Sequence, residues 1–248
     1  MTISEITSVL QTDGVVLVED AMSDNQCQRL LDGIEWGFHN REGPLPLQRQ
    51  RTYEWFREHP IFIELLEHPL VIAVADACLG PDYHLICAET TRNERDNHFL
   101  EAVKNVHQDH CFFPEDQERL VEMQTRMYGF TAQWVAHDIP HEMGPTEFIV
   151  GSHVDHRRYT NEEAPSAIDY RDHFPKGSLV FYDHRTWHRG TDNHADRPRD
   201  LTQNCYALHA VDKVQIRTPQ PNGPDVYEPC TDLIESGSEI IRKLLSRV

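Results

Sequence analysis

The sequence predicts a mainly β fold, a double-stranded β-helix of the jelly-roll, cupin-like kind with flanking helices. Short apolar runs typical of strands, separated by turn residues, dominate from residue 83 to residue 211. Helical periodicity is concentrated at the two ends of the chain. A chain of 248 residues is long enough to bury one full core. We therefore expect a single domain over residues 1–248, with helical support over about 1–80, a jelly-roll core over about 82–212 and a C-terminal helix over about 232–247.

Helical segments fill most of the first 80 residues and carry apolar side chains every three or four positions. Ser23 and Gln26 have the spacing of a capping box, which satisfies backbone N–H groups where a helix begins. Asp13-Gly14 ends the first helix, and the run Val15-Val16-Leu17-Val18 predicts a short buried strand directly after it. The expected helices are residues 3–12, a segment after Ser23, and one or two helices within residues 60–79.

The strands of the core are predicted from short β-branched or aromatic runs. We expect them at residues 83–88, 105–111, 128–139, 146–150 and 178–182, near His188, and at residues 201–211. Two polar segments interrupt them. Residues 114–126 look helical, and residues 154–176 are expected to form an exposed loop.

The net charge of −18 argues against two classes of partner. A field of that sign repels nucleic acid and anionic membranes, and no Lys/Arg cluster offsets it. No apolar run is long enough to cross a bilayer, and the N-terminus lacks the basic and apolar regions of a signal peptide. We therefore expect a cytoplasmic protein that acts on a small-molecule substrate, without nucleic-acid or membrane partners. The sequence does not indicate its oligomeric state.

His107 and Asp109 are the best candidates for metal ligands. They stand two residues apart on a predicted strand, so their side chains point to the same face. One imidazole and one carboxylate are two of the three ligands in the facial triad of non-haem Fe(II) oxygenases. The third ligand must come from another strand, and the candidates are His153, His184, His188 and His209.

His188 has the best context for the third ligand. It follows the predicted strand 178–182, and Arg199 stands eleven residues further along the chain. A guanidinium group grips a carboxylate at two points, so a buried arginine near a metal-ligating histidine suits a dicarboxylate cosubstrate. A competing interpretation is a helical zinc pair, because His184 and His188 have i, i+4 spacing. Otherwise we expect His184 at the rim of the site and His153 in a turn.

Three segments resemble the phytanoyl-CoA dioxygenase (PhyH-like) family of Fe(II)/2-oxoglutarate-dependent oxygenases. They are His107-Gln108-Asp109-His110-Cys111-Phe112-Phe113-Pro114, the stretch from Trp134-Val135-Ala136 through Gly144-Pro145-Thr146 to Gly151-Ser152-His153, and the stretch from Gly177-Ser178-Leu179-Val180-Phe181 through His188 and Asn193 to Arg197-Pro198-Arg199. The resemblance covers most of residues 1–212, and the combined spacing of the segments is its specific feature.

The resemblance implies a metal site and a cosubstrate site. His107, Asp109 and His188 would be the catalytic metal ligands and bind Fe(II), and Arg199 would pair with the distal carboxylate of 2-oxoglutarate. O2 would be the second cosubstrate, and ascorbate would serve as the reductant in vitro.

Three further residues are assigned by the resemblance alone. Trp134 would line the cosubstrate pocket, where the alternative is an ordinary core aromatic residue. Asn105 would place an amide near 2-oxoglutarate, where the alternative is a solvated strand residue. Arg92 is the one candidate for a basic residue that relatives often carry on the strand before the first histidine.

The implied activity is that of a dioxygenase, an oxidoreductase that hydroxylates a small metabolite, in natural-product biosynthesis for example. Desaturation or ring closure can start from the same chemistry. Asp109 argues against halogenation, because related halogenases replace this carboxylate with a small residue. The polar loops 40–57, 92–104, 112–126 and 154–175 are expected to carry the substrate-binding residues, with 112–126 as a lid or as part of the substrate site.

Two other functions remain open from the sequence. The same three ligands could hold Zn or Mn in a cupin-like metal hydrolase or isomerase, which would not need Arg199 in its pocket. A catalytically silent small-molecule-binding protein could also keep this fold.

Overall fold

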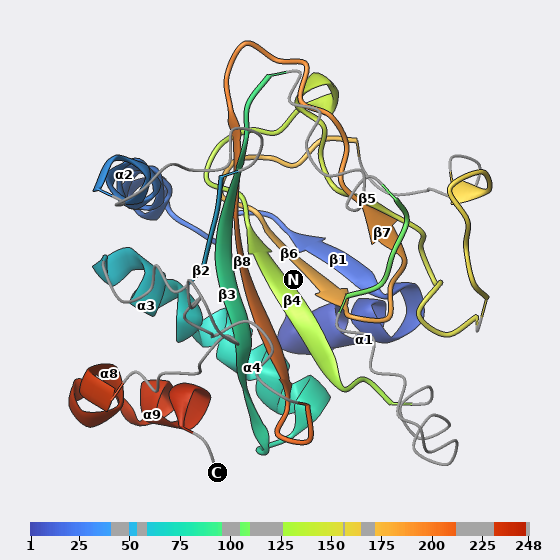
Figure 1. The fold of residues 1–248 in the computed structure, drawn as a ribbon. Helices are drawn as coiled ribbons and strands as arrows, with labels where there is room; N and C mark the ends of the chain where they lie inside the picture. The colour runs from blue at the N-terminus through green and yellow to red at the C-terminus, as the bar shows by residue number, and fades with distance from the viewer. Residues whose placement is uncertain are drawn as a thin grey trace, which may run out of the picture.

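A six-stranded antiparallel sheet forms the centre of the structure (Figure 1). The computed structural model describes residues 1–40, 50–53, 59–95, 105–109, 126–155, 157–164, 172–211 and 231–246. Across the sheet the strand order is β1–β6–β4–β8–β3–β2, and each neighbouring pair is antiparallel. The strands are β1 (Val15–Val18), β2 (Gln50–Tyr53), β3 (Tyr83–Asn93), β4 (Gly129–Trp134), β6 (Leu179–Asp183) and β8 (Arg199–Leu208).

A second, two-stranded sheet consists of β5 (Glu147–Phe148) and β7 (His188–Arg189), which pair antiparallel. Apolar side chains of the two sheets meet in one cluster, which includes Tyr182 of β6, Leu201 of β8 and Phe148 of β5. Two antiparallel sheets that enclose a core are the arrangement of a jelly roll. The predicted mainly β fold with flanking helices is therefore confirmed.

Helices cover the opposite face of the large sheet, away from β5 and β7 (Figure 1). The predicted capping box is confirmed, because the Ser23 N–H donates to Gln26 Oε1 (3.0 Å) and the Gln26 N–H donates to Ser23 Oγ (3.3 Å). No helix among the described residues is long and apolar enough to cross a membrane. The helices are α1 (Ile3–Asp13), α2 (Asp24–Asn40), α3 (Pro60–Leu66), α4 (Pro69–Leu79), the 3-10 helix His141–Met143, α8 (Thr231–Ser236) and α9 (Glu239–Leu245).

Side-chain alternation along the strands sorts the residues of the large sheet between two cores. On β4, Phe130, Ala132 and Trp134 belong to the cluster under the helices. Tyr182 on β6 and Leu201 on β8 belong to the cluster that faces β5 and β7. The second face, which we call the β5/β7 side, is therefore the one that can carry a site enclosed by the two sheets.

The structure corrects two predicted strands. Residues 105–109 form an isolated bridge between His107 and His188 and no continuous strand. The strand expected at 128–139 ends at Trp134, because the chain turns at Ala136 and His137 before Ile139 bridges to Phe174.

Two further predictions change towards the end of the chain. The expected C-terminal helix is divided at Gly237, and Ser238 caps α9 by accepting the Ile241 N–H. The loop expected to be exposed at 154–176 buries Ala164 and Phe174 completely. The predicted lid at 112–126 lies almost wholly outside the described residues, as do most of the loops at 40–57 and 92–104.

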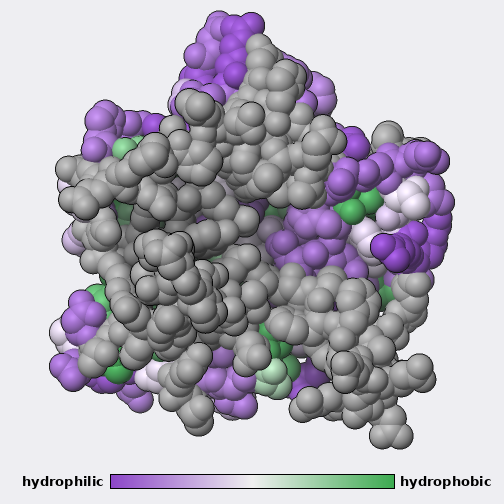
Figure 2. All heavy atoms as spheres, viewed as in Figure 1, coloured by the Kyte–Doolittle hydropathy of each residue, from purple (hydrophilic) through white to green (hydrophobic). Residues whose placement is uncertain are grey.

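Hydrophilic residues predominate among the coloured atoms on the face shown in Figure 2. Among the described residues, the exposed large hydrophobic side chains are Met1, Trp36 and Val154. They stand far apart in the sequence, and this surface accords with the net charge of −18.

Candidate metal centre

His107, Asp109 and His188 lie together on the β5/β7 side of the large sheet. His107 and His188 exchange two backbone N–H···O hydrogen bonds of 2.9 Å, and the Asp109 N–H donates to the His184 carbonyl (3.0 Å). One ligand atom from each of the three side chains falls within 4.8 Å of the other two. Among the described residues this is the only group of three or more such side chains with that geometry.

Backbone carbonyls orient both imidazole rings. His107 Nδ1 lies 2.8 Å from the carbonyl oxygen of Asn105, and His188 Nδ1 lies 2.9 Å from that of Thr186. A carbonyl oxygen can only accept, so each Nδ1 carries the proton and each Nε2 keeps its lone pair. The Nε2 atoms of His107 and His188 lie 3.9 Å and 3.6 Å from oxygens of Asp109. Metal-ligating histidines usually have this arrangement, with the second nitrogen held by a carbonyl or carboxylate.

His188 is neutral near pH 7. Burial lowers the pKa of His188 to about 4, although the Asp109 carboxylate opposes that shift. A neutral imidazole is the form that binds a metal ion.

A chain of polar side chains supports Asp109 from the large sheet. The Tyr182 hydroxyl donates to Asp109 Oδ2 (3.0 Å). Gln203 Nε2 donates both to the Tyr182 oxygen (3.3 Å) and to Gln133 Oε1 (3.0 Å), which also accepts from the Thr146 hydroxyl (3.3 Å). Gln133 is completely buried, yet its Nε2 has no hydrogen-bond partner among the residues that the structure describes. A buried amide N–H group without an acceptor is unfavourable, so Gln133 Nε2 is available to donate a hydrogen bond to an oxygen atom of a ligand.

Arg199 stands at the start of β8 and is 5% exposed. Strand alternation puts it on the same face as Leu201 and Gln203, which is the β5/β7 side. Its Nη1 donates to the Thr191 carbonyl (3.2 Å). The guanidinium group is thus buried on the same side of the sheet as the three candidate ligands.

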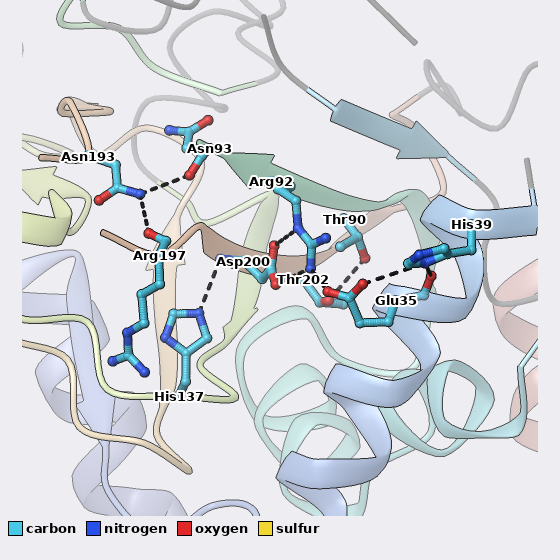
Figure 3. A network of polar contacts seen from close by, with 10 residues as sticks. All are labelled: Glu35, His39, Thr90, Arg92, Asn93, His137, Asn193, Arg197, Asp200 and Thr202. Atoms are coloured by element: carbon cyan, nitrogen blue, oxygen red, sulfur yellow. Dashed lines mark hydrogen bonds and ion pairs between the residues drawn. The ribbon is translucent and has the colours of Figure 1, made fainter. Parts of the chain in front are cut away.

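The residue after Arg199, Asp200, belongs to an ion-pair network that connects β8 with the helical side of the molecule (Figure 3). Asp200 points to the opposite face, where Arg92 Nε and Nη2 donate to its two oxygens at 2.7 Å and 2.8 Å. Arg92 also binds Glu35 of α2. Arg92, the candidate for the basic residue on the strand before the first histidine, therefore points to the helical side of the sheet and away from β5 and β7.

Trp134, which was predicted to line the cosubstrate pocket, points to the helical side of the sheet, and its role at the cosubstrate stays a prediction. Its side chain is completely buried under the helices, edge-to-face with His68 at 5.1 Å between ring centroids. The preceding residue, Gln133, points to the β5/β7 side because neighbouring side chains on a strand alternate. Gln133, and not Trp134, is therefore the residue of this pair whose side chain lies on the same side of the sheet as the three candidate ligands.

Asn105 lies beside the candidate ligands, but its side chain is at the surface. Asn161 Nδ2 donates to Asn105 Oδ1, while the Asn105 backbone carbonyl accepts from His107 Nδ1. Its visible contribution is therefore to orient His107 through the main chain. Whether its amide meets a cosubstrate stays a prediction.

The competing histidines lie elsewhere. His184 is completely buried in a turn, so it is neither at the rim nor on a helix with His188. His153 lies after Gly151-Ser152, and its Nε2 contacts the Gln11 carbonyl of α1 at 3.1 Å. His209 packs on His84, with 4.5 Å between ring centroids.

Sequence reasoning missed Tyr182, Gln133 and Gln203. The signal that could have found them is the alternation of each predicted strand, once its buried face had been assigned.

Comparisons with known proteins agree with this geometry. The sequence model of a family described as Phytanoyl-CoA dioxygenase (PhyH) matches residues 10–201. A search of curated protein sequences finds no match.

Solved structures with a similar fold include three proteins. The epimerase SnoN in complex with Fe3+, alpha ketoglutarate and nogalamycin RO is 18% identical, with a TM-score of 0.67 over 90% of this chain and 92% of that chain. The non-heme alpha ketoglutarate dependent carbocyclase SnoK from nogalamycin biosynthesis is 19% identical, with a TM-score of 0.64 over 84% and 87%. HygX from Streptomyces hygroscopicus with nickel, 2-oxoglutarate and hygromycin B bound is 14% identical, with a TM-score of 0.66 over 84% and 88%. At these identities the likeness establishes the fold.

Proposed function

Because the chain belongs to the phytanoyl-CoA dioxygenase family, we propose that it is a non-haem Fe(II)- and 2-oxoglutarate-dependent dioxygenase acting on a small organic molecule. The observation that carries the proposal is the cluster of His107, Asp109 and His188, whose ligand atoms lie within 4.8 Å of one another. Two imidazoles and one carboxylate are the donor set of the facial triad, which suits Fe(II) and leaves other coordination positions open.

The residues present fit the metal. His107 and His188 each offer an Nε2 lone pair, because their Nδ1 protons are held by carbonyls. The carboxylate of Asp109 supplies the negative charge that stabilises a divalent cation in a partly buried site.

The residues also fit a dicarboxylate cosubstrate. Arg199 would pair with the distal carboxylate, since a buried guanidinium group binds a carboxylate in two places. The unpartnered Nε2 of Gln133 would donate to a further oxygen of the bound ligand. When bound at this site, Fe(II), 2-oxoglutarate and O2 supply the oxidation of a C–H bond, and 2-oxoglutarate is converted to succinate and CO2.

Hydroxylation is the proposed reaction, with desaturation and ring closure as its chemical neighbours. The presence of Asp109 favours these outcomes over halogen transfer. SnoN and SnoK are named as an epimerase and a carbocyclase of nogalamycin biosynthesis, and HygX was solved with hygromycin B. These likenesses support a substrate among the intermediates of natural-product biosynthesis.

Arg199 favours the oxygenase over a metal hydrolase or a silent binding protein. The buried guanidinium group of Arg199, on the same side of the sheet as the metal site, suits the carboxylate of a cosubstrate. Hydrolysis at Zn or Mn does not need a buried arginine at that place.

The test is a turnover assay of the purified protein with Fe(II), ascorbate and 2-oxoglutarate. We expect slow formation of succinate even without substrate, and none from His107→Ala. Arg199→Ala should weaken 2-oxoglutarate binding by about 3 kcal/mol, roughly 100-fold, and keep its affinity for Ni(II). A wild-type protein that neither forms succinate nor binds 2-oxoglutarate would sink the proposal. Full activity of Arg199→Ala would instead point to a hydrolase.

A further inference from the structure

Asp109 belongs to the short segment of residues 105–109, which lies outside both sheets. The Val106 N–H donates to Asn161 Oδ1 (2.8 Å), and Gln108 Nε2 donates to the Arg185 carbonyl. Residues 105–109 form no continuous strand and join β7 through the isolated His107–His188 bridge. The backbone of Asp109 itself adds one hydrogen bond, to the His184 carbonyl. A carboxylate on such a segment has several rotamers within reach, so other contacts must select the one that faces both histidines.

Tyr182 supplies such a contact from the large sheet. It lies near the end of β6, inside the large sheet, and is 1% exposed. Its hydroxyl donates to Asp109 Oδ2 (3.0 Å), and its ring lies 5.0 Å from that of His188, measured between centroids. One side chain thus touches two of the three candidate ligands.

The direction of the hydrogen bonds is determined by the neighbours of Tyr182. Gln203 Nε2 lies 3.3 Å from the Tyr182 oxygen and 3.0 Å from Gln133 Oε1, so its two N–H groups donate to both. The Tyr182 oxygen therefore accepts from Gln203, and its own proton points to the carboxylate.

The Gln203 amide is in turn set by a neighbouring strand. Gln203 on β8 and Gln133 on β4 are paired directly across the sheet. The Thr146 hydroxyl donates to the same Gln133 oxygen (3.3 Å). Side chains from β4, β6 and β8 thus form one chain of hydrogen bonds that ends on Asp109, and such networks hold their members more firmly than single contacts do.

We propose that Tyr182 is a positioning residue for the metal centre, holding the Asp109 carboxylate in the orientation in which it binds a divalent cation together with His107 and His188. This inference rests on the proposed function, because it presumes that the cluster binds metal. The physical reason is preorganisation: a ligand that is already oriented loses less conformational entropy when the ion binds.

The proposal predicts a specific loss in Tyr182→Phe. This change removes one hydroxyl and keeps the ring that packs against His188 and Phe148. Removing a group that orients a metal ligand typically weakens metal binding by about 10- to 100-fold. We expect a loss of that size in Ni(II) affinity. Gln203→Met should give a smaller loss, because it removes only the donor that orients the Tyr182 hydroxyl.

Tyr206→Phe is the matched control. Tyr206 is also completely buried in the large sheet, but its hydroxyl donates to the Leu66 carbonyl (2.8 Å) on the helical side. Both variants remove one buried hydroxyl that makes a hydrogen bond, so both should lower the free energy of unfolding by a similar amount. Only Tyr182→Phe should weaken Ni(II) binding.

The experiment is isothermal titration of the metal-free full chain with Ni(II), together with urea unfolding of each variant in EDTA. Ni(II) binding by Tyr182→Phe that equals the wild-type value would overturn the inference and leave the proposed function intact. An equal loss in Tyr206→Phe would also overturn it, since the loss would then follow general destabilisation. A wild-type chain that binds neither Ni(II) nor Fe(II) would overturn the proposed function and this inference together.

Discussion

Two neighbouring residues on β4 have opposite roles because their side chains leave the strand on opposite faces. Trp134 packs under the helices against His68, while Gln133 reaches Gln203 and Thr146 on the β5/β7 side. The Gln133 oxygen accepts two hydrogen bonds, and its nitrogen has no acceptor within the described part of the chain. The residue of β4 that faces the side of the candidate ligands is therefore Gln133, one position before the aromatic residue that the sequence suggested.

This difference between faces can be tested with Gln133→Met and Trp134→Phe. Gln133→Met should weaken 2-oxoglutarate binding about tenfold, because a hydrogen bond to a charged oxygen contributes about 1.5 kcal/mol or more. Trp134→Phe should leave that affinity unchanged and lower the free energy of unfolding by about 1–3 kcal/mol, as is usual when a core is underpacked. Titration of the Ni(II)-loaded variants with 2-oxoglutarate measures the first effect, and urea unfolding measures the second. A loss of affinity in Trp134→Phe with none in Gln133→Met would contradict the assignment of the two faces.

At the scale of secondary-structure elements, one arginine joins three of them. Arg92 of β3 binds Asp200 of β8 through two hydrogen bonds and Glu35 of α2 through a third contact (Figure 3). The Asn193 side chain donates to the carbonyls of Asn93 and Arg197 at 2.9 Å and 2.8 Å, which closes the adjacent loop. These contacts hold the start of β8, where Arg199 is located.

The two carboxylates that bind Arg92 should differ in their contribution to stability. The Asp200 side chain is 5% exposed, whereas that of Glu35 is 50% exposed. Asp200→Asn should lower the free energy of unfolding by about 3 kcal/mol, since it removes the buried carboxylate from the Arg92 charge and leaves only the half-exposed Glu35. Glu35→Gln should lower it by less than about 1 kcal/mol, because water already screens that pair. Urea unfolding of both variants measures the difference, and equal effects would show that burial does not set the strength of these ion pairs.

Across the whole molecule, the large sheet separates two environments. Helices and the larger apolar cluster lie on one face, and the chain of hydrogen-bonded polar side chains that leads to Asp109 lies on the other.

His137, in the turn that follows β4, contacts the start of β8. The Asp200 N–H donates to His137 Nε2 (3.2 Å), while His137 Nδ1 donates to the Asp138 carbonyl (2.9 Å). Only the neutral imidazole can make both hydrogen bonds, because a protonated ring would turn a second donor towards the Asp200 N–H.

The stability of the whole chain should therefore depend on pH through His137. Burial lowers the pKa of His137 below its usual value of 6.5. Well above about pH 6.5 the ring is neutral in both the folded and the unfolded chain, so a change in pH there does not change the free energy of unfolding through His137. As the pH falls below that value the unfolded chain binds the proton first, so the free energy of unfolding decreases.

His137→Gln isolates this effect, because glutamine keeps an acceptor for the Asp200 N–H and cannot be protonated. The variant should lose less stability than the wild type between about pH 7.5 and about pH 5.8 in urea unfolding experiments without metal. A His137→Gln profile parallel to that of the wild type would contradict the assignment.

Much of the fold could be predicted from local signals. The capping box at Ser23, the strand at Val15–Val18 and the helix end at Gly14 depend on residues close in sequence, and the structure has each of them. Strand lengths were less predictable, because the end of β4 at Trp134 depends on the turn at His137 and its contact with β8. The break at Gly237 in the C-terminal helix was not predicted, although glycine and serine are a local signal for it.

By itself, the sequence determined which residue types stand at the spacing of a metal site: His107 and Asp109 two positions apart, and His188 followed by Arg199. Spacing along a chain is enough for this, because neighbouring side chains on an extended segment have fixed relative directions. Only the tertiary structure decided which face of each strand meets the site. It put Gln133, Gln203 and Tyr182 on the β5/β7 side, and Trp134 and Arg92 on the helical side. The physical reason is that the face of a strand is set by what packs against it, and those elements come from distant parts of the chain.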